Sequence, residues 1–93
     1  MATLMIRHSV ADFDVWKRGY DDADWLRERH GITFASVHRD GSDPQRVMAV
    51  HRFRDMNGAK AFVDAVRPLM EKIGVQGQPE IWFGEDLEQV TYS

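Results

Sequence analysis

The sequence contains no cysteine, only three prolines among 93 residues, and little excess charge of either sign. Without cysteine there is no disulfide framework and no thiolate chemistry. The formal net charge of −3 argues against nucleic acid as a partner, because nucleic-acid-binding proteins usually concentrate basic residues on one face. No apolar run approaches the length of a membrane span, and the N-terminus shows no signal-peptide core. We therefore expect no membrane partner and a cytoplasmic location.

The length suits a single domain over residues 1–93, with a modest core. The chain contains many aromatic residues for a core of this size: five Phe, three Trp and two Tyr. Part of this aromatic surface is therefore expected either to be covered by a partner chain or to line a pocket.

The first half of the chain predicts a strand, a helix and a hairpin. Residues 2–9 alternate between apolar and polar types, as in a half-buried strand. Apolar residues at helical spacing follow, with Asp12 as the N-cap, Gly19 as the place for a bend, and Gly31 as the C-terminal stop. Strands are then predicted over 32–39 and 46–53, joined by the turn-forming residues "DGSDPQ".

The second half predicts one more helix and one more strand. Asp55 is placed to cap the helix, which carries an apolar stripe. Pro68 falls inside that stripe and predicts a kink or a split, because its ring removes one backbone hydrogen bond. The loosened segment 67–78 would then be a candidate lid over a pocket. A loop is predicted over 74–79, and a last strand over 80–87.

The predicted fold class is α+β. The order strand, helix, strand, strand, helix, strand is that of the ferredoxin-like βαββαβ sandwich, with a four-stranded antiparallel sheet of order 4-1-3-2. Both helices are expected on one face of the sheet. Strands one and three lie side by side at its centre, and right-handed crossovers suggest that these two run parallel.

Two histidines occupy equivalent positions in the two halves of this pattern. His8 ends one apolar stretch and precedes Asp12 by four residues, and His51 stands in the same relation to Asp55. We therefore expect the two imidazoles on neighbouring strands, at the same level and on the same face. The alternation along both strands assigns that face to the helices and leaves Arg7, Met48, Val50 and Arg52 on the open face.

Aromatic residues are predicted around the histidine pair. Trp16 and Tyr20 lie on the sheet-facing stripe of the first helix, Phe34 would face His51 across the hairpin, and Trp82 or Phe83 would come from the last strand. Two polar rings within an aromatic shell are typical of a small-molecule pocket. A buried histidine pair held only by backbone hydrogen bonds is the structural alternative.

The other polar candidates are weaker. His38 lies about 13 Å along the hairpin from Phe34, which argues against a metal site made of three histidines. His30 ends the first helix and is interpreted as structural, and residues 27–30 are interpreted as a solvated helix end. No metal-binding motif and no glycine-rich phosphate loop is present, so neither a metal nor a cofactor is expected.

Three segments resemble the dimeric α+β barrel superfamily, which includes the antibiotic biosynthesis monooxygenases and small polyketide cyclases. They are "HSVADFDVWKRGYD", "DPQRVMAVHRFRDMNGAKAF" and "GVQGQPEIWFGE". The resemblance implies a homodimer whose two sheets pack open face to open face. It also implies a pocket for a small hydrophobic or aromatic ligand in each subunit, between the sheet and the helices.

Two classes of function follow. The first is a cofactor-independent enzyme acting on an aromatic or polyketide-like substrate, in which His8 or His51 removes a proton and Tyr20 or the other histidine stabilises the anion. The anion would then react with dioxygen (monooxygenase) or with an internal carbonyl (cyclase). Trp16, Phe34, Phe83 and Trp82 would contact the substrate. The alternative is a non-catalytic dimer that binds a small ligand or haem.

Overall fold

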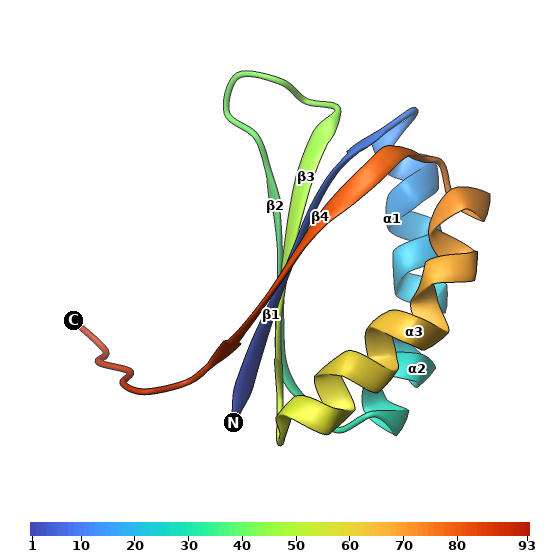
Figure 1. Cartoon of the computed structure of the whole chain (residues 1–93). Helices are drawn as coiled ribbons and strands as arrows, with labels where there is room; N and C mark the ends of the chain where they lie inside the picture. Colours follow the sequence, from blue (N-terminus) through green and yellow to red (C-terminus); the bar gives the residue numbers. More distant parts are fainter.

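A computed structural model describes residues 1–93 as four strands and three helices. The elements are, in chain order, β1 (Ala2–Val10), α1 (Phe13–Asp22), α2 (Asp24–Arg29), β2 (Ile32–Arg39), β3 (Arg46–Phe53), α3 (Met56–Lys72) and β4 (Val75–Glu85). The strands form one sheet of order β2-β3-β1-β4, which is the predicted order 4-1-3-2 read from the other edge. All three helices cover one face of this sheet, and the other face is open (Figure 1). The ferredoxin-like α+β fold class is thereby confirmed.

The two central strands are antiparallel, so the predicted parallel arrangement of this pair is wrong. β1 pairs with β3 in an unbroken register in which Ile6 lies opposite Ala49. These two residues are 43 positions apart, the same spacing that separates His8 from His51. The two halves of the chain are therefore related by an approximate two-fold axis that passes through the Ile6–Ala49 pair. An axis perpendicular to a sheet reverses strand direction, which is why equivalent strands run antiparallel.

The first predicted helix is divided, and the division falls at Ala23 rather than at Gly19. α1 ends at Asp22, and α2 starts at Asp24 after one non-helical residue. Gly19 instead allows a close approach between helices, because a Cβ atom at this position would collide with the side chain of Ile73. The small residue thus serves packing between α1 and the end of α3.

Pro68 does not split α3. The helix is continuous from Met56 to Lys72, and β4 begins at Val75, so the predicted lid over 67–78 does not exist. Pro68 and Asp64 are both exposed, so water can reach the carbonyl group that loses its helical hydrogen bond.

β4 begins five residues earlier than predicted. The glycine- and proline-containing stretch 75–79 belongs to the strand, and pairing with β1 is irregular there: Arg7 lies opposite Glu80, whereas Ser9 lies opposite Gln76. Gly77 has a positive φ of 69° within this bulge. The turn-type composition therefore encodes a bulged strand, which sequence patterns do not distinguish from a loop. The pairing of β1 with β3 is unaffected.

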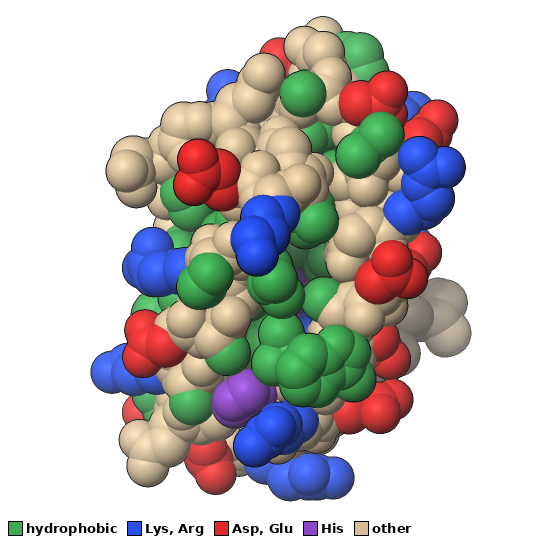
Figure 2. All heavy atoms as spheres, turned by 90° about the vertical axis from the view of Figure 1, so that its right-hand side faces the viewer, with side chains coloured by type: hydrophobic (Ala, Val, Ile, Leu, Met, Phe, Trp, Pro, Cys, Tyr) green, Lys and Arg blue, Asp and Glu red, His purple; other side chains and the backbone are tan.

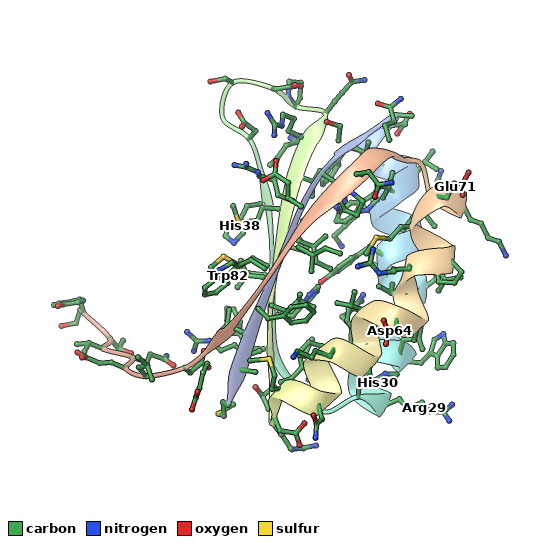
Figure 3. The ribbon with its side chains drawn as sticks, in the orientation of Figure 1. Arg29, His30, His38, Asp64, Glu71 and Trp82 are labelled. Carbon is green, nitrogen blue, oxygen red and sulfur yellow. The ribbon has the colours of Figure 1, made fainter.

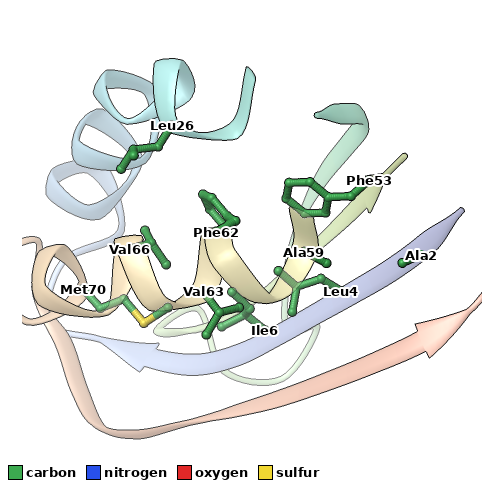
Figure 4. Packing of buried hydrophobic residues seen from close by; sticks show 10 residues of the cluster. All are labelled: Ala2, Leu4, Ile6, Leu26, Phe53, Ala59, Phe62, Val63, Val66 and Met70. Atoms are coloured by element: carbon green, nitrogen blue, oxygen red, sulfur yellow. The ribbon is translucent and has the colours of Figure 1, made fainter. Parts of the chain in front are cut away.

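The main hydrophobic core lies between the sheet and α3 (Figure 4). It comprises ten buried residues: Ala2, Leu4, Ile6, Leu26, Phe53, Ala59, Phe62, Val63, Val66 and Met70. A smaller cluster of Val10, Trp16 and Val47 lies under α1. The space between these two clusters contains the polar residues described next. None of the helices has the length and apolarity needed to cross a membrane.

Candidate functional site

Both predicted N-caps are present, so the backbone follows the same path from each histidine to the start of the next helix. Asp12 Oδ1 accepts a hydrogen bond from the Val15 amide at 3.1 Å, and Asp55 Oδ1 accepts one from the Gly58 amide at 2.7 Å. The glycines that precede β2 and β4, Gly31 and Gly74, also lie 43 residues apart, with φ values of 87° and 91°. The internal repeat therefore extends from strand end to helix cap to helix stop.

His8 and His51 lie on the helix-facing side of neighbouring strands, as expected, but not at the same level. His8 is opposite Val47 and His51 is opposite Leu4. The two residues are thus four positions apart along the strands, or about 13 Å. The antiparallel arrangement separates them, because each lies two residues from the pseudo-two-fold axis in opposite directions.

A single cavity connects the two histidines. Its floor is the Ile6–Ala49 pair, and its polar lining consists of His8, His51, Tyr20 and Arg27. The helix layer forms the remaining walls, with Trp16 of α1, Ala23 between α1 and α2, and the α3 residues Phe62, Val66, Leu69 and Met70 followed by the C-cap Ile73. Most of the lining is therefore apolar, with few polar groups, as in sites for small organic ligands.

Side chains fill most of the cavity in this structure. About 420 Å³ of space between these residues is free of atoms, counting the open mouth, but only about 30 Å³ can hold the centre of a water molecule. That is room for about two waters. Figure 2 views the helix layer from outside and shows hydrophobic side chains gathered along the seam between the helices. A ligand larger than water needs this seam to widen.

Tyr20, His51 and Arg27 form one connected group at one end of the cavity. The Tyr20 hydroxyl lies 2.7 Å from Nε2 of His51, a hydrogen bond in which either group can donate, depending on the imidazole tautomer. The Arg27 guanidinium lies 3.8 Å from the centre of the Tyr20 ring and donates to the Tyr20 carbonyl oxygen at 2.7 Å. Arg27 Nε also donates to Asp24 at 3.2 Å. The group thus combines a hydroxyl, an imidazole and a fixed positive charge.

His8 lies at the other end and has no hydrogen-bond partner on either ring nitrogen, although it is only 6% exposed. Its ring packs 5.4 Å from that of Trp16, which in turn lies 5.0 Å from Tyr20. Nδ1 of His51 is also buried without a partner. These unpaired nitrogens argue against the structural alternative, in which backbone hydrogen bonds hold both imidazoles.

Burial keeps both imidazoles uncharged. Desolvation lowers the pKa of His8 to about 4, and desolvation together with the Arg27 charge lowers the pKa of His51 to about 4. Desolvation raises the pKa of Tyr20, and the nearby Arg27 charge opposes that increase. Both histidines are therefore weaker bases than exposed imidazole.

Arg27 is a site residue that sequence reasoning missed. It is 3% exposed, so the interpretation of residues 27–30 as a solvated helix end is wrong at its first position. The stripe Trp16, Tyr20, Ala23 continues at helical spacing to residue 27, which was the available signal. The buried position is tolerated because Asp24 and the Tyr20 carbonyl both accept from the guanidinium.

Three predicted pocket residues lie elsewhere. Phe34 is opposite Arg52 rather than His51, because the pairing across the hairpin is shifted by one residue from the expected pairing, and a one-residue shift reverses the face of the strand. Trp82 lies on the open face, opposite Met5, and points away from the helices (Figure 3). Phe83 faces the helices but packs against the core beside Leu4, outside the cavity lining.

The remaining histidines lie outside the cavity. His30 Nδ1 donates to the Leu26 carbonyl at 2.8 Å at the end of α2. His38 is exposed on the open face beside Ser36 (Figure 3). No three His, Asp or Glu side chains lie close enough together to hold a metal ion.

The fold and the position of the cavity define a general class: small α+β sandwiches with a mostly apolar cavity between the sheet and the helices. No protein-family model matches the sequence. No curated protein sequence matches it either. Its similarity to known proteins is therefore structural: many solved chains share its fold.

The similar structures include antibiotic biosynthesis monooxygenase-like proteins. SnoaB, a cofactor-independent oxygenase from Streptomyces nogalater, superposes with a TM-score of 0.77 at 10% identity, over 98% of this chain and 97% of that chain. The monooxygenase ActVA-Orf6 of Streptomyces coelicolor, solved with nanaomycin D, has a TM-score of 0.70 at 17% identity, over 99% and 92%. A candidate antibiotic biosynthesis monooxygenase from Bordetella bronchiseptica has 0.74 at 17%, over 94% and 97%. At these identities the similarity shows the fold, and the site must supply the argument for function.

Proposed function

We propose that this chain is a small cofactor-independent enzyme that removes a proton from an aromatic or polyketide-like substrate, with monooxygenase chemistry as the leading form. The observation that carries the proposal is the 2.7 Å hydrogen bond between Tyr20 and His51 inside the cavity, beside the buried Arg27 guanidinium. The similarity to SnoaB and to ActVA-Orf6 supports this choice among the activities that such a site could perform.

His51 is the proposed base because it alone of the two cavity histidines has polar neighbours. The bound substrate, a phenol or an activated methylene, gives its proton to a free nitrogen of His51. A negative charge forming beside the imidazole raises the pKa of that ring, so the base gains strength as the substrate ionises. The Tyr20 hydroxyl and the Arg27 charge stabilise the phenolate or enolate that results.

The oxygenation step needs no further reductant, since the substrate supplies the electrons. The substrate carbanion forms a carbon–oxygen bond with dioxygen, and the resulting peroxide takes up a proton. Loss of water from this hydroperoxide converts a ring methylene to a ring carbonyl, so that one dioxygen is consumed and one water is formed. In the cyclase form the same carbanion attacks an internal carbonyl, and no dioxygen is consumed.

The test is dioxygen consumption with 1,8-dihydroxyanthrone, a phenol whose ring carries an acidic methylene. We expect turnover by the wild-type protein and a decrease of roughly 10²–10⁴-fold in His51→Ala, the usual range for loss of a general base. Tyr20→Phe and Arg27→Met should also lower the rate. His38→Ala, which removes an exposed histidine of the open face, is the matched control and should keep full activity. A wild-type rate equal to that of buffer, or equal rates in wild type and His51→Ala, would contradict the oxygenase proposal.

The alternative function is ligand binding without catalysis, favoured by the unpaired nitrogens of His8 and His51. It predicts that the anthrone binds without dioxygen consumption and that His51→Ala changes affinity alone. For haem binding, titration with haemin would produce a Soret band that shifts in His8→Ala. No shift in absorbance relative to free haemin removes the haem version.

We also propose that residues 1–93 act as a single dimeric α+β barrel domain, in which a second copy covers the open face of the sheet. Met5 and Trp82 are exposed on this face, at 37% and 56%, next to the half-buried Met48 and Val50. Monomers seldom leave a contiguous apolar patch of this kind in contact with water.

A further inference from the structure

The His8 end of the cavity holds polar atoms that the proposed reaction does not use. Both ring nitrogens of His8 are buried, and neither has a partner. The side chain is 94% buried, yet it lines the cavity that Tyr20 and His51 share. An imidazole carries one donor and one acceptor, so a molecule that enters the cavity finds two unused hydrogen-bonding positions at this end.

The pseudo-two-fold axis places this second polar group at a defined separation from the first. His8 lies two residues beyond the Ile6–Ala49 floor on β1, and His51 lies two residues beyond it on β3 in the opposite direction. The cavity therefore extends diagonally across that floor. The backbones of His8 and His51 are about 13 Å apart along the strands. Their side chains can reach toward each other, so the polar atoms can lie closer together than that.

The two ends differ in charge, although the backbone around them is repeated. The position 43 residues after Arg27 is Met70, and the position 43 residues after Tyr20 is Val63. Neither residue is polar: Met70 lines the cavity with its thioether side chain, and Val63 packs in the main core. The His51 end suits a group that ionises, whereas the His8 end suits a neutral oxygen.

We infer that the ligand is an elongated molecule with oxygen functions at both ends, and that His8 is the residue that positions its far, neutral end. A hydroxyl or carbonyl group hydrogen-bonded to His8 would orient the ionising group toward Tyr20 and His51. The lowered pKa of His8 is consistent with this role, because a neutral imidazole can both donate and accept. This inference rests on the proposed function for the identity of the ionising end.

The test compares the binding of 2-hydroxyanthraquinone with that of 2,6-dihydroxyanthraquinone by isothermal titration calorimetry. The second compound adds a hydroxyl at the opposite end, and neither compound has an acidic methylene, so binding is measured without turnover. The dihydroxy compound can bind in two equivalent orientations, which alone would favour it by about twofold. One added hydrogen bond should increase that preference to roughly tenfold. His8→Leu should reduce the preference to about twofold, and His38→Leu should retain it.

The outcomes separate the two proposals. If the wild-type protein binds both compounds and prefers the second by no more than the statistical factor, His8 contacts only water and the inference is wrong, while the proposed function stands. If neither compound binds, the inference is wrong, and dioxygen consumption with 1,8-dihydroxyanthrone alone decides the proposed function. The wild-type comparison needs no variant, and His8→Phe repeats the test if His8→Leu does not fold.

Discussion

Acidification should destabilise this protein through two buried histidines, well above the pH at which most carboxylates are protonated. In the unfolded chain His8 and His51 have a pKa near 6.5, and burial lowers the folded value to about 4 in each case. Between these values the unfolded state binds protons that the folded state does not. The free energy of unfolding is therefore fully retained above pH 6.5 and decreases as the pH falls toward 4.

The expected magnitude is large for a chain of this size. Each histidine should lower the free energy of unfolding by about 2 kcal/mol between pH 7 and pH 5, and by about 3 kcal/mol once the pH reaches 4. Together these losses approach the total stability of a typical small domain, which is about 5–15 kcal/mol. The only charged side chain that contributes to either shift is Arg27, which lowers the pKa of His51 in the same direction as burial.

Urea unfolding at pH 7, 6 and 5 measures the effect. His8→Leu should remove about half of the loss between pH 7 and pH 5 and raise the stability at pH 7, because a buried group without partners is replaced by an apolar one. His51→Leu should also reduce the pH dependence, but should lower the stability at pH 7, because it leaves the Tyr20 hydroxyl unpaired. His38→Leu is the control. A wild-type unfolding free energy that is the same at pH 5 and pH 7, or a His8→Leu variant with the wild-type pH dependence, would refute the reasoning.

Three further predictions concern assembly and packing. Val50→Glu on the open face should convert a dimer at micromolar concentration to a monomer in sedimentation experiments, and a wild-type protein that is already monomeric would contradict the proposed interface. Gly19→Ala should destabilise the fold by about 1–3 kcal/mol despite the better helix propensity of alanine, because the added methyl collides with Ile73. The double variant Gly19→Ala/Ile73→Ala should recover part of that loss. A single variant as stable as wild type would show that the collision is relieved. Pro68→Ala should raise the free energy of unfolding by about 1–3 kcal/mol, because it restores a hydrogen bond inside a continuous, exposed helix; an unchanged urea midpoint would count against this account.

Local sequence signals were sufficient wherever the answer depended on a few neighbouring residues. The caps at Asp12 and Asp55 and the ranges of β2 and β3 were predicted correctly, since capping needs only a side-chain oxygen and a strand needs only alternation. The same alternation placed His8 and His51 on the helix face. The split predicted at Pro68 is absent for the converse reason: it depends on whether water reaches the freed carbonyl, and that is a property of the packed helix.

The composition of the cavity depended on longer-range geometry. Whether Phe34 faced His51 depended on the pairing across the hairpin, and a shift of one residue placed it on the open face. Arg27 is buried because α2 packs its guanidinium 3.8 Å from the centre of the Tyr20 ring, a contact between residues of two helices. Neither feature has a strong local signature.

The sequence alone determined the order of the elements, the internal repeat at 43 residues and the side of the sheet on which the two histidines lie, because each follows from periodicity and spacing along the chain. Only the tertiary structure decided that the repeat is antiparallel, so that the histidines stand at opposite ends of one cavity rather than side by side. It also decided that one of them meets Tyr20 and Arg27 while the other meets no polar group. Those contacts join residues from different elements, and their distances are set by how the helices pack on the sheet.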